Sequence, residues 1–116
     1  MFLGEYHHTV DEKGRLAMPS KFRGALATGV VVTRGLDRSL FVYPKAEWEL
    51  VATKLAALPL GQADTRAFAR LMLAGAMEVE LDSSGRVNIP EYLRTYAGLT
   101  KDVVVAGLYN RLEVWD

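Results

Sequence analysis

Cysteine is absent from this sequence of 116 residues. Disulfide bonds and thiolate metal sites are therefore excluded, and a reducing cytoplasm suits the chain. Long apolar runs are absent too, because the most apolar stretch, 71–77, is far shorter than the roughly 20 residues that cross a bilayer. The N-terminal segment is acidic and carries two histidines, whereas an export signal needs a basic start and an unbroken apolar run. We expect neither a membrane partner nor export.

An excess of positive charge is also lacking, since 14 Lys and Arg residues are balanced by 14 Asp and Glu residues. A protein that coats nucleic acid without regard to sequence needs surplus cations, so this class is disfavoured. The balance is uneven along the chain: residues 1–43 carry six cationic and four acidic side chains, and residues 72–116 carry four and seven. If a polyanion binds, the first part of the chain should dominate. The length and the 50% hydrophobic content are typical of one soluble globular domain.

One pattern of residues occurs twice. The stretch DEKGRLAMP at 11–19 returns as DSSGRVNIP at 82–90, with Asp, Gly, Arg and Pro in register. With one residue inserted, the match resumes, and TRGLDRSLFVY at 33–43 lies over VAGLYNRLEVW at 105–115. The chain therefore contains an internal duplication, and we assign the first copy to 1–44, a connector to 45–71 and the second copy to 72–116.

Each copy predicts the same order of elements. An alternating strand leads into a tight turn, in which Asp accepts hydrogen bonds from turn amides and Gly supplies a positive φ. A second strand follows and must stop at Pro19 or Pro90, after which a short helix runs to about Gly29 or Gly98. Two β-branched strands close the copy. The predicted strands are 5–10, 15–19, 30–33 and 40–43 in the first copy, and 77–81, 86–90, 103–106 and 112–115 in the second.

The connector predicts two helices. The first begins at Pro44, and the second, with Asp64 as its cap, carries an apolar stripe of Phe68, Leu71 and Met72. Pro59 and Gly61 separate the two helices. A small half-barrel cannot cover its own inner face, so we expect the copies to interlock about a pseudo-twofold axis. The expected fold class is α+β, a pseudo-twofold β-barrel with a central helical hairpin.

The repeated turn itself requires Asp and Gly, so Asp11, Gly14, Asp82 and Gly85 serve the turn first. It does not require arginine. Arg15 and Arg86 lie on the strand face opposite the apolar residues, beside an Asp that can hold the guanidinium. As a surface ion pair this would be worth only about 0 to 1 kcal/mol. The alternative is a presented guanidinium fork, which suits phosphate oxygens and the O6 and N7 edge of guanine.

The segments MFLGEYHHTVDEKGRLAMPSKFR, DSSGRVNIPEYLR and LEVW closely resemble the MraZ family, bacterial regulators with two AbrB-like swapped-hairpin repeats. The resemblance covers essentially the whole chain. It implies a transcriptional regulator, expected to be a cytoplasmic, nucleoid-associated repressor, that binds double-stranded DNA. The DNA would be short direct repeats in its own promoter, at the head of the division and cell wall gene cluster.

The resemblance also assigns residues and an assembly. Similar proteins bind DNA through an Asp-x-x-x-Arg motif, which falls on Asp11 and Arg15 and again on Asp82 and Arg86. Lys13 fits this pattern and adds phosphate attraction, whereas Ser84 takes the place of a basic residue in the second copy. The family assembles into homo-oligomeric rings, usually with a helical segment after the position of Trp115. Several neutral protomers on successive DNA repeats would gain affinity through effective concentration.

Three further readings remain. The second connector helix could act as a recognition helix through Thr65, Arg66 and Arg70, and the protein could instead be an oligomeric assembly or interaction module without DNA binding. Arg23 and Arg94, which also recur, could brace the turns.

An enzyme is disfavoured, as are a metal and a cofactor. His7 and His8 point to opposite strand faces, no nucleophile has a base beside it, and no phosphate-binding glycine motif or small-molecule site is present.

Overall fold

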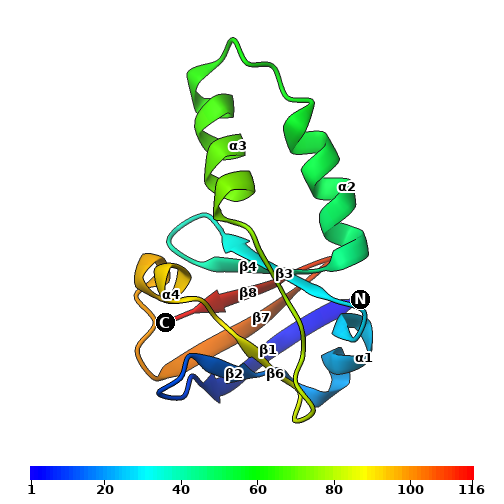
Figure 1. Ribbon diagram of the computed structural model, residues 1–116, viewed down its shortest axis with the longest axis vertical. Coiled ribbons are helices and arrows are strands. Elements are labelled where there is room, and N and C mark those ends of the chain that lie inside the picture. Colours follow the sequence, from blue (N-terminus) through cyan, green and yellow to red (C-terminus); the bar gives the residue numbers. More distant parts are fainter.

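Eight strands form two antiparallel sheets in the computed structural model, which describes residues 1–116 (Figure 1). The larger sheet has six strands in the order β1-β7-β8-β4-β3-β5, and the smaller pairs β2 with β6. The strands are β1 (Phe2–Thr9), β2 (Arg15–Ala17), β3 (Val30–Arg34), β4 (Leu40–Pro44), β5 (Met77–Val79), β6 (Arg86–Asn88), β7 (Asp102–Tyr109) and β8 (Leu112–Trp115). All eight predicted strands are confirmed, with β2, β5 and β6 shorter than expected.

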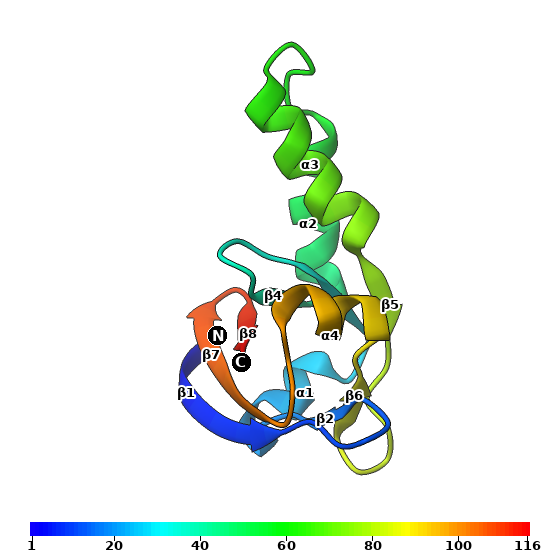
Figure 2. The same ribbon diagram turned by 90° about the vertical axis from the view of Figure 1, so that its left-hand side faces the viewer.

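Four α-helices complete the fold: α1 (Arg23–Leu26), α2 (Lys45–Ala56), α3 (Ala63–Gly75) and α4 (Glu91–Ala97). A single 3₁₀ turn, Ser20–Phe22, precedes α1, and α4 begins directly after Pro90. Gly98 ends α4 in the left-handed conformation, with φ 64°, as the sequence predicted. Helices α2 and α3 form a hairpin that stands away from the body of the molecule (Figures 1 and 2). The principal extents of the whole molecule are 43 × 26 × 22 Å. None of the helices is long and apolar enough to span a membrane.

The two copies pair with each other more than with themselves. Strand β1 lies along the whole of β7, from Phe2 opposite Tyr109 to Thr9 opposite Asp102. Leu16 of β2 faces Val87 of β6, so the smaller sheet also joins the copies. Strands β1 and β2, which are neighbours in the chain, meet only at one isolated bridge. The predicted turn at 11–14 is therefore present, but its flanking strands do not extend into a long local hairpin.

One hydrophobic core of 18 buried residues draws on both copies. Its most enclosed members include the alternating residues of β2 and β6 and the residues that follow them. Leu16, Met18, Val87 and Ile89 are all fully buried, at 0% exposure, which confirms the predicted apolar face of these strands. The α+β class is confirmed. The sheets that hydrogen bonding defines are an open six-stranded sheet and a two-stranded ribbon, and the closed barrel stays a prediction.

The helical hairpin packs on strands β3 and β4 through a second apolar cluster, Phe41, Tyr43, Leu55 and Met72. Thr33 on β3 is fully buried, and its hydroxyl donates to the carbonyl oxygen of Met72 over 2.6 Å. The predicted stripe on α3 is confirmed for two of its three residues, since Met72 belongs to this cluster and Phe68 packs against it, whereas Leu71 is half-buried outside it. The predicted cap is wrong: Gln62 occupies the cap position, and Asp64 lies inside the first turn of α3.

Candidate nucleic-acid interface

Each repeated turn is organised by its aspartate. In the first turn, Asp11 Oδ1 accepts hydrogen bonds from the backbone amides of Lys13 and Arg15, both over 2.9 Å. Its backbone carbonyl accepts from Gly14 N over 3.0 Å, and its amide donates to Arg15 O over 3.0 Å. Gly14 has φ 83°, a conformation that glycine adopts without strain. The predicted turn chemistry is therefore confirmed in the first copy.

The second turn repeats this arrangement. Asp82 Oδ1 accepts from the amides of Ser84 and Arg86, both over 2.9 Å, and Gly85 has φ 76°. The side chain of each arginine is then held by the remaining carboxylate oxygen. Arg15 Nε donates to Asp11 Oδ2 over 2.7 Å, and Arg86 Nε donates to Asp82 Oδ2 over 2.9 Å. Each aspartate thus fixes both its turn and its arginine.

The arginines are held in a way that leaves their outer edges available. Only Nε is used by the aspartate, and the terminal nitrogens of Arg15 and Arg86 make no hydrogen bond or ion pair within the chain. About a third of each arginine side chain, 33%, is exposed. Two parallel N–H groups on one edge of a guanidinium match two acceptors of a phosphate or of guanine. The turns therefore present two oriented donor forks to solvent.

Hydrogen bonding also sets the charge of the aspartates. The backbone amide of Arg15 is the main cause that holds the pKa of Asp11 below its usual value of 3.8, and the Arg15 side chain and the Lys13 amide act in the same direction. The amide of Arg86 likewise lowers the pKa of Asp82 below 3.8. An aspartate is ionised at neutral pH even at its usual pKa, and the lowered pKa keeps both carboxylates charged at more acidic pH, where they still hold the guanidinium groups.

The glycines of the two turns are buried, and each lies beneath an arginine of the other copy. A Cβ atom on Gly14 would lie 2.9 Å from Nε and Cζ of Arg94, and one on Gly85 would collide with the guanidinium of Arg23. Arg94 Nε donates to Ile89 O and Arg23 Nε donates to Met18 O, both over 2.9 Å. The recurrence of Arg23 and Arg94 was visible in the sequence, but the crossing between copies was not.

Both turns lie at the end of the molecule opposite the α2–α3 hairpin. Figures 1 and 2 show the first turn in dark blue and the second in yellow-green at the lower end of the body. Arg66 and Arg70, the rival DNA-binding residues, belong to α3 at the other end. Arg66 donates through a terminal nitrogen to Leu60 O over 2.7 Å and so braces the loop between the two helices. One molecular face cannot present both sets of arginines.

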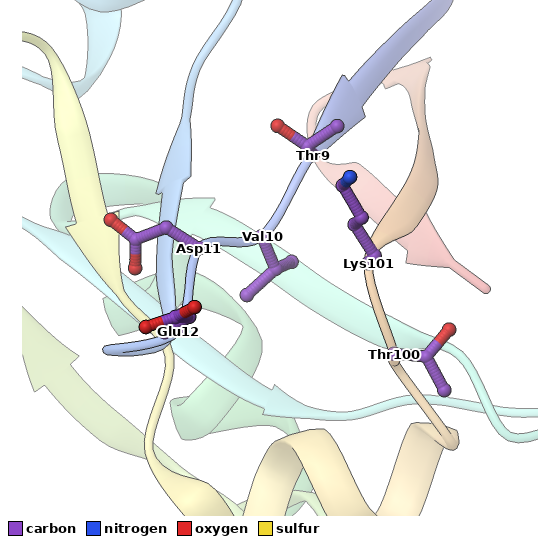
Figure 3. Close-up of a pocket in the computed structure, with 6 residues that line it drawn as sticks. All are labelled: Thr9, Val10, Asp11, Glu12, Thr100 and Lys101. Atoms are coloured by element: carbon purple, nitrogen blue, oxygen red, sulfur yellow. The ribbon is translucent and has the colours of Figure 1, made fainter.

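An open hollow of about 400 Å³ borders the first turn. Figure 3 shows the carboxylates of Asp11 and Glu12 on one side and Lys101 and Thr100 on the other. Lys101 belongs to the second copy, and its carbonyl accepts from Val10 N over 2.8 Å. A smaller hollow of about 200 Å³ is lined by Asp11, Glu12, Lys13 and Arg15 themselves. The first turn thus has concave surroundings that include cations from both copies.

The two histidines lie on the outer sheet strand β1, opposite Val104 and Val103. His7 is exposed and His8 half-buried, as expected for adjacent strand residues that face opposite ways. The chain contains no group of three or more His, Asp and Glu side chains placed to hold a metal ion.

The fold and these turns define a class: a two-copy α+β protein that presents two aspartate-held arginines on one end. Comparison with known proteins agrees with this class. The sequence model of the family described as "MraZ protein, putative antitoxin-like" matches residues 1–71 and 72–116. A protein named Transcriptional regulator MraZ, from Natranaerobius thermophilus, is 51% identical over 115 residues, which cover 99% of this chain and 80% of that protein. The chain belongs to the MraZ family.

Proposed function

We propose that this protein is a sequence-specific DNA-binding transcriptional regulator and that its two Asp-x-x-Gly-Arg turns read DNA. One observation carries the proposal: two arginines, Arg15 and Arg86, are each held by an ionised aspartate through Nε and keep their terminal nitrogens free. A surface ion pair alone would add little stability, so its repetition in both copies favours a ligand. Membership in the MraZ family, with a relative named as a transcriptional regulator, supports the same function.

In this proposal Arg15 and Arg86 contact base edges or phosphates, and Asp11 and Asp82 orient them. Gly14 and Gly85 allow the turn conformation, and exposed Lys13 adds attraction to phosphate. The activity is binding without catalysis and uses no cofactor. The first turn should contribute more than the second, because Lys13 has the uncharged Ser84 as its counterpart.

The finer proposal concerns the target and the assembly. The DNA consists of short direct repeats in the protein's own promoter, at the head of the division and cell wall gene cluster, and the outcome is repression. The protein acts in the cytoplasm at the nucleoid as a ring-shaped homo-oligomer. Each protomer supplies two swapped-hairpin repeats, 1–44 and 72–116, that close a barrel, and a helical connector, 45–71. A ring that touches several repeats at once gains affinity that a neutral protomer lacks.

The alternative function is an oligomeric assembly module that does not bind DNA. An exposed apolar pair near one edge of the larger sheet favours it, since Leu3 of β1 and Leu108 of β7 lie opposite each other and are 54% and 37% exposed. Such a surface suits contact with another protein. Gel filtration with and without the protein's own upstream DNA separates the two functions, because a pure assembly module elutes identically in both cases.

The proposal is tested by titrating the protein with a duplex from upstream of its own gene and with a scrambled duplex of equal length. We expect tight, salt-sensitive binding to the native duplex and weak binding to the scrambled one. Equal affinity for both, or no binding, would contradict sequence-specific recognition. A reporter driven by the same upstream DNA should fall in expression when the protein is supplied, and a rise would contradict repression.

A further inference from the structure

We infer that each DNA-contacting unit of this protein is built from both copies: Arg94 acts with the first turn, and Arg23 acts with the second. The inference rests on the proposed function and adds two binding residues to it. It also predicts which residues cooperate, since the partner of Arg15 is Arg94 of the other copy and the partner of Arg86 is Arg23.

The first observation is the crossing of the backbone at the turns. Gly14 O accepts from Ile89 N over 2.8 Å, and Gly85 O accepts from Met18 N over 3.0 Å. Each turn is therefore hydrogen-bonded to the segment that leads into the helix of the other copy. The arginine of that helix follows five residues later, and its Nε donates a hydrogen bond back to the same segment. Arg94 Nε donates to Ile89 O, and Arg23 Nε donates to Met18 O.

The second observation is the close approach of each arginine to the opposite turn. The Arg94 guanidinium covers Gly14, which precedes Arg15, and the Arg23 guanidinium covers Gly85, which precedes Arg86. Arg23 and Arg94 are half-buried, and their terminal nitrogens make no hydrogen bond or ion pair within the chain. The only buried side-chain nitrogen without a partner belongs to Arg111, so the terminal nitrogens of Arg23 and Arg94 are not fully buried.

The third observation concerns charge. In the first turn Asp11 and Glu12 balance Lys13 and Arg15, and in the second turn Asp82 balances Arg86. A turn without net charge attracts phosphate poorly. The crossing arginine gives each turn one surplus positive charge, and Lys101 beside the first turn gives that turn another. A structural brace would need only Nε, whereas the free terminal nitrogens provide the donors that a phosphate accepts.

The test is a pair of double-mutant cycles on affinity for the duplex from upstream of the protein's own gene. The crossing pair is Arg15→Ala with Arg94→Ala, and the matched same-copy pair is Arg15→Ala with Arg23→Ala. Residues that act as one unit show non-additive losses, and residues that act apart show losses that multiply. We expect Arg94→Ala alone to cost about 10-fold in affinity and to reduce the salt slope by about one.

In the crossing pair, we expect the double variant to bind no more than about twice as weakly as Arg15→Ala alone, whereas the same-copy losses should multiply. Equal coupling in both pairs would overturn the inference. An unchanged dependence of affinity on salt concentration in Arg94→Ala would overturn it too. A residue that only braces the turn changes the affinity, but its loss does not change the number of counterions released on binding. Arg94→Lys keeps the charge and should restore the wild-type slope even if its thermal stability falls. Wild-type protein that does not prefer its own upstream DNA would instead contradict the proposed function.

Discussion

The guanidinium of Arg94 lies directly over the backbone of Gly14, although the two residues belong to different copies of the repeat. Alanine at position 14 would be strained for two reasons. Its φ would have to stay at 83°, and its Cβ would lie 3.0 Å from the carbonyl oxygen of Ile89. We expect Gly14→Ala to lower the free energy of unfolding by about 1–3 kcal/mol, measured by urea denaturation.

Gly24 is the matched control for this substitution. It lies in helix α1, and a Cβ built on it meets no atom within 4 Å apart from its chain neighbours and the backbone of its own helix. Gly24→Ala should leave stability unchanged or raise it by about 0.5–1 kcal/mol, because alanine is the better helix former. If both variants lose the same stability, the close approach of Arg94 has no structural consequence and the description of the turn is wrong.

The buried hydroxyl of Thr33 attaches the helical hairpin to the sheet through Met72 O. Valine has a similar shape but no donor, so Thr33→Val leaves a buried carbonyl unpaired and should cost about 1–3 kcal/mol. Thr53→Val is the comparison, because the exposed Thr53 hydroxyl bonds only within α2, to Glu49 O. A thermal melt in which the two variants are equally stable would show that Thr33 contributes nothing beyond its volume.

The lowered pKa values of Asp11 and Asp82 link the turns to pH. A carboxyl whose pKa is lower in the folded protein stabilises the fold above its unfolded-state value, near 3.8, and that stabilisation disappears as the pH falls below it. We expect carboxyl NMR titrations of both residues to have midpoints below 3.8. In Arg15→Ala the pKa of Asp11 should rise and yet stay below 3.8, because the amide of residue 15 remains.

Arg86→Ala is the control for that titration, since it should move the pKa of Asp82 and leave Asp11 as in the wild type. An Asp11 that titrates at 3.8 or above in the wild type would mean that the two backbone hydrogen bonds to Oδ1 are not formed in solution.

Arg66 and Arg70 provide a test of the rival DNA-binding surface. They lie on α3, far along the molecule from both turns (Figure 1). The Arg66→Ala, Arg70→Ala double variant should bind the native upstream duplex within about twofold of wild type and with the same salt slope, because phosphate contacts alone set that slope. A loss of binding comparable to that of Arg15→Ala would place the DNA on the helical hairpin.

Much of the fold was predictable because its signals are local. Prolines that end strands, glycines with positive φ and alternating apolar residues lie within a few positions of one another in the sequence. These signals located every strand and helix. The cap of α3 was missed, because Asp64 has the right chemistry but Gln62 is the residue with extended backbone, at φ −105° and ψ 125°. Cap identity depends on where the preceding loop ends, which the hydrophobic pattern does not fix.

The pairing between copies was expected only in general terms. No local pattern in the sequence indicates that β1 pairs with β7, or that the Tyr96 hydroxyl donates to Gly35 O over 2.6 Å. At the turns, the sequence predicted the aspartate, the glycine and the exposed arginine. It could not assign Arg94 to Gly14, since a contact across 80 residues follows from the interlocking of the copies and from nothing in either segment alone.

The most direct test of the central claim is the affinity of the Arg15→Ala, Arg86→Ala double variant for the native upstream duplex, measured beside wild type at two salt concentrations. Each arginine fork is worth about 1–3 kcal/mol, so we expect a loss of at least about 30-fold and a shallower salt slope, with the thermal melt retained. A folded double variant that binds the native duplex as tightly as wild type would contradict the claim that the repeated turns read DNA.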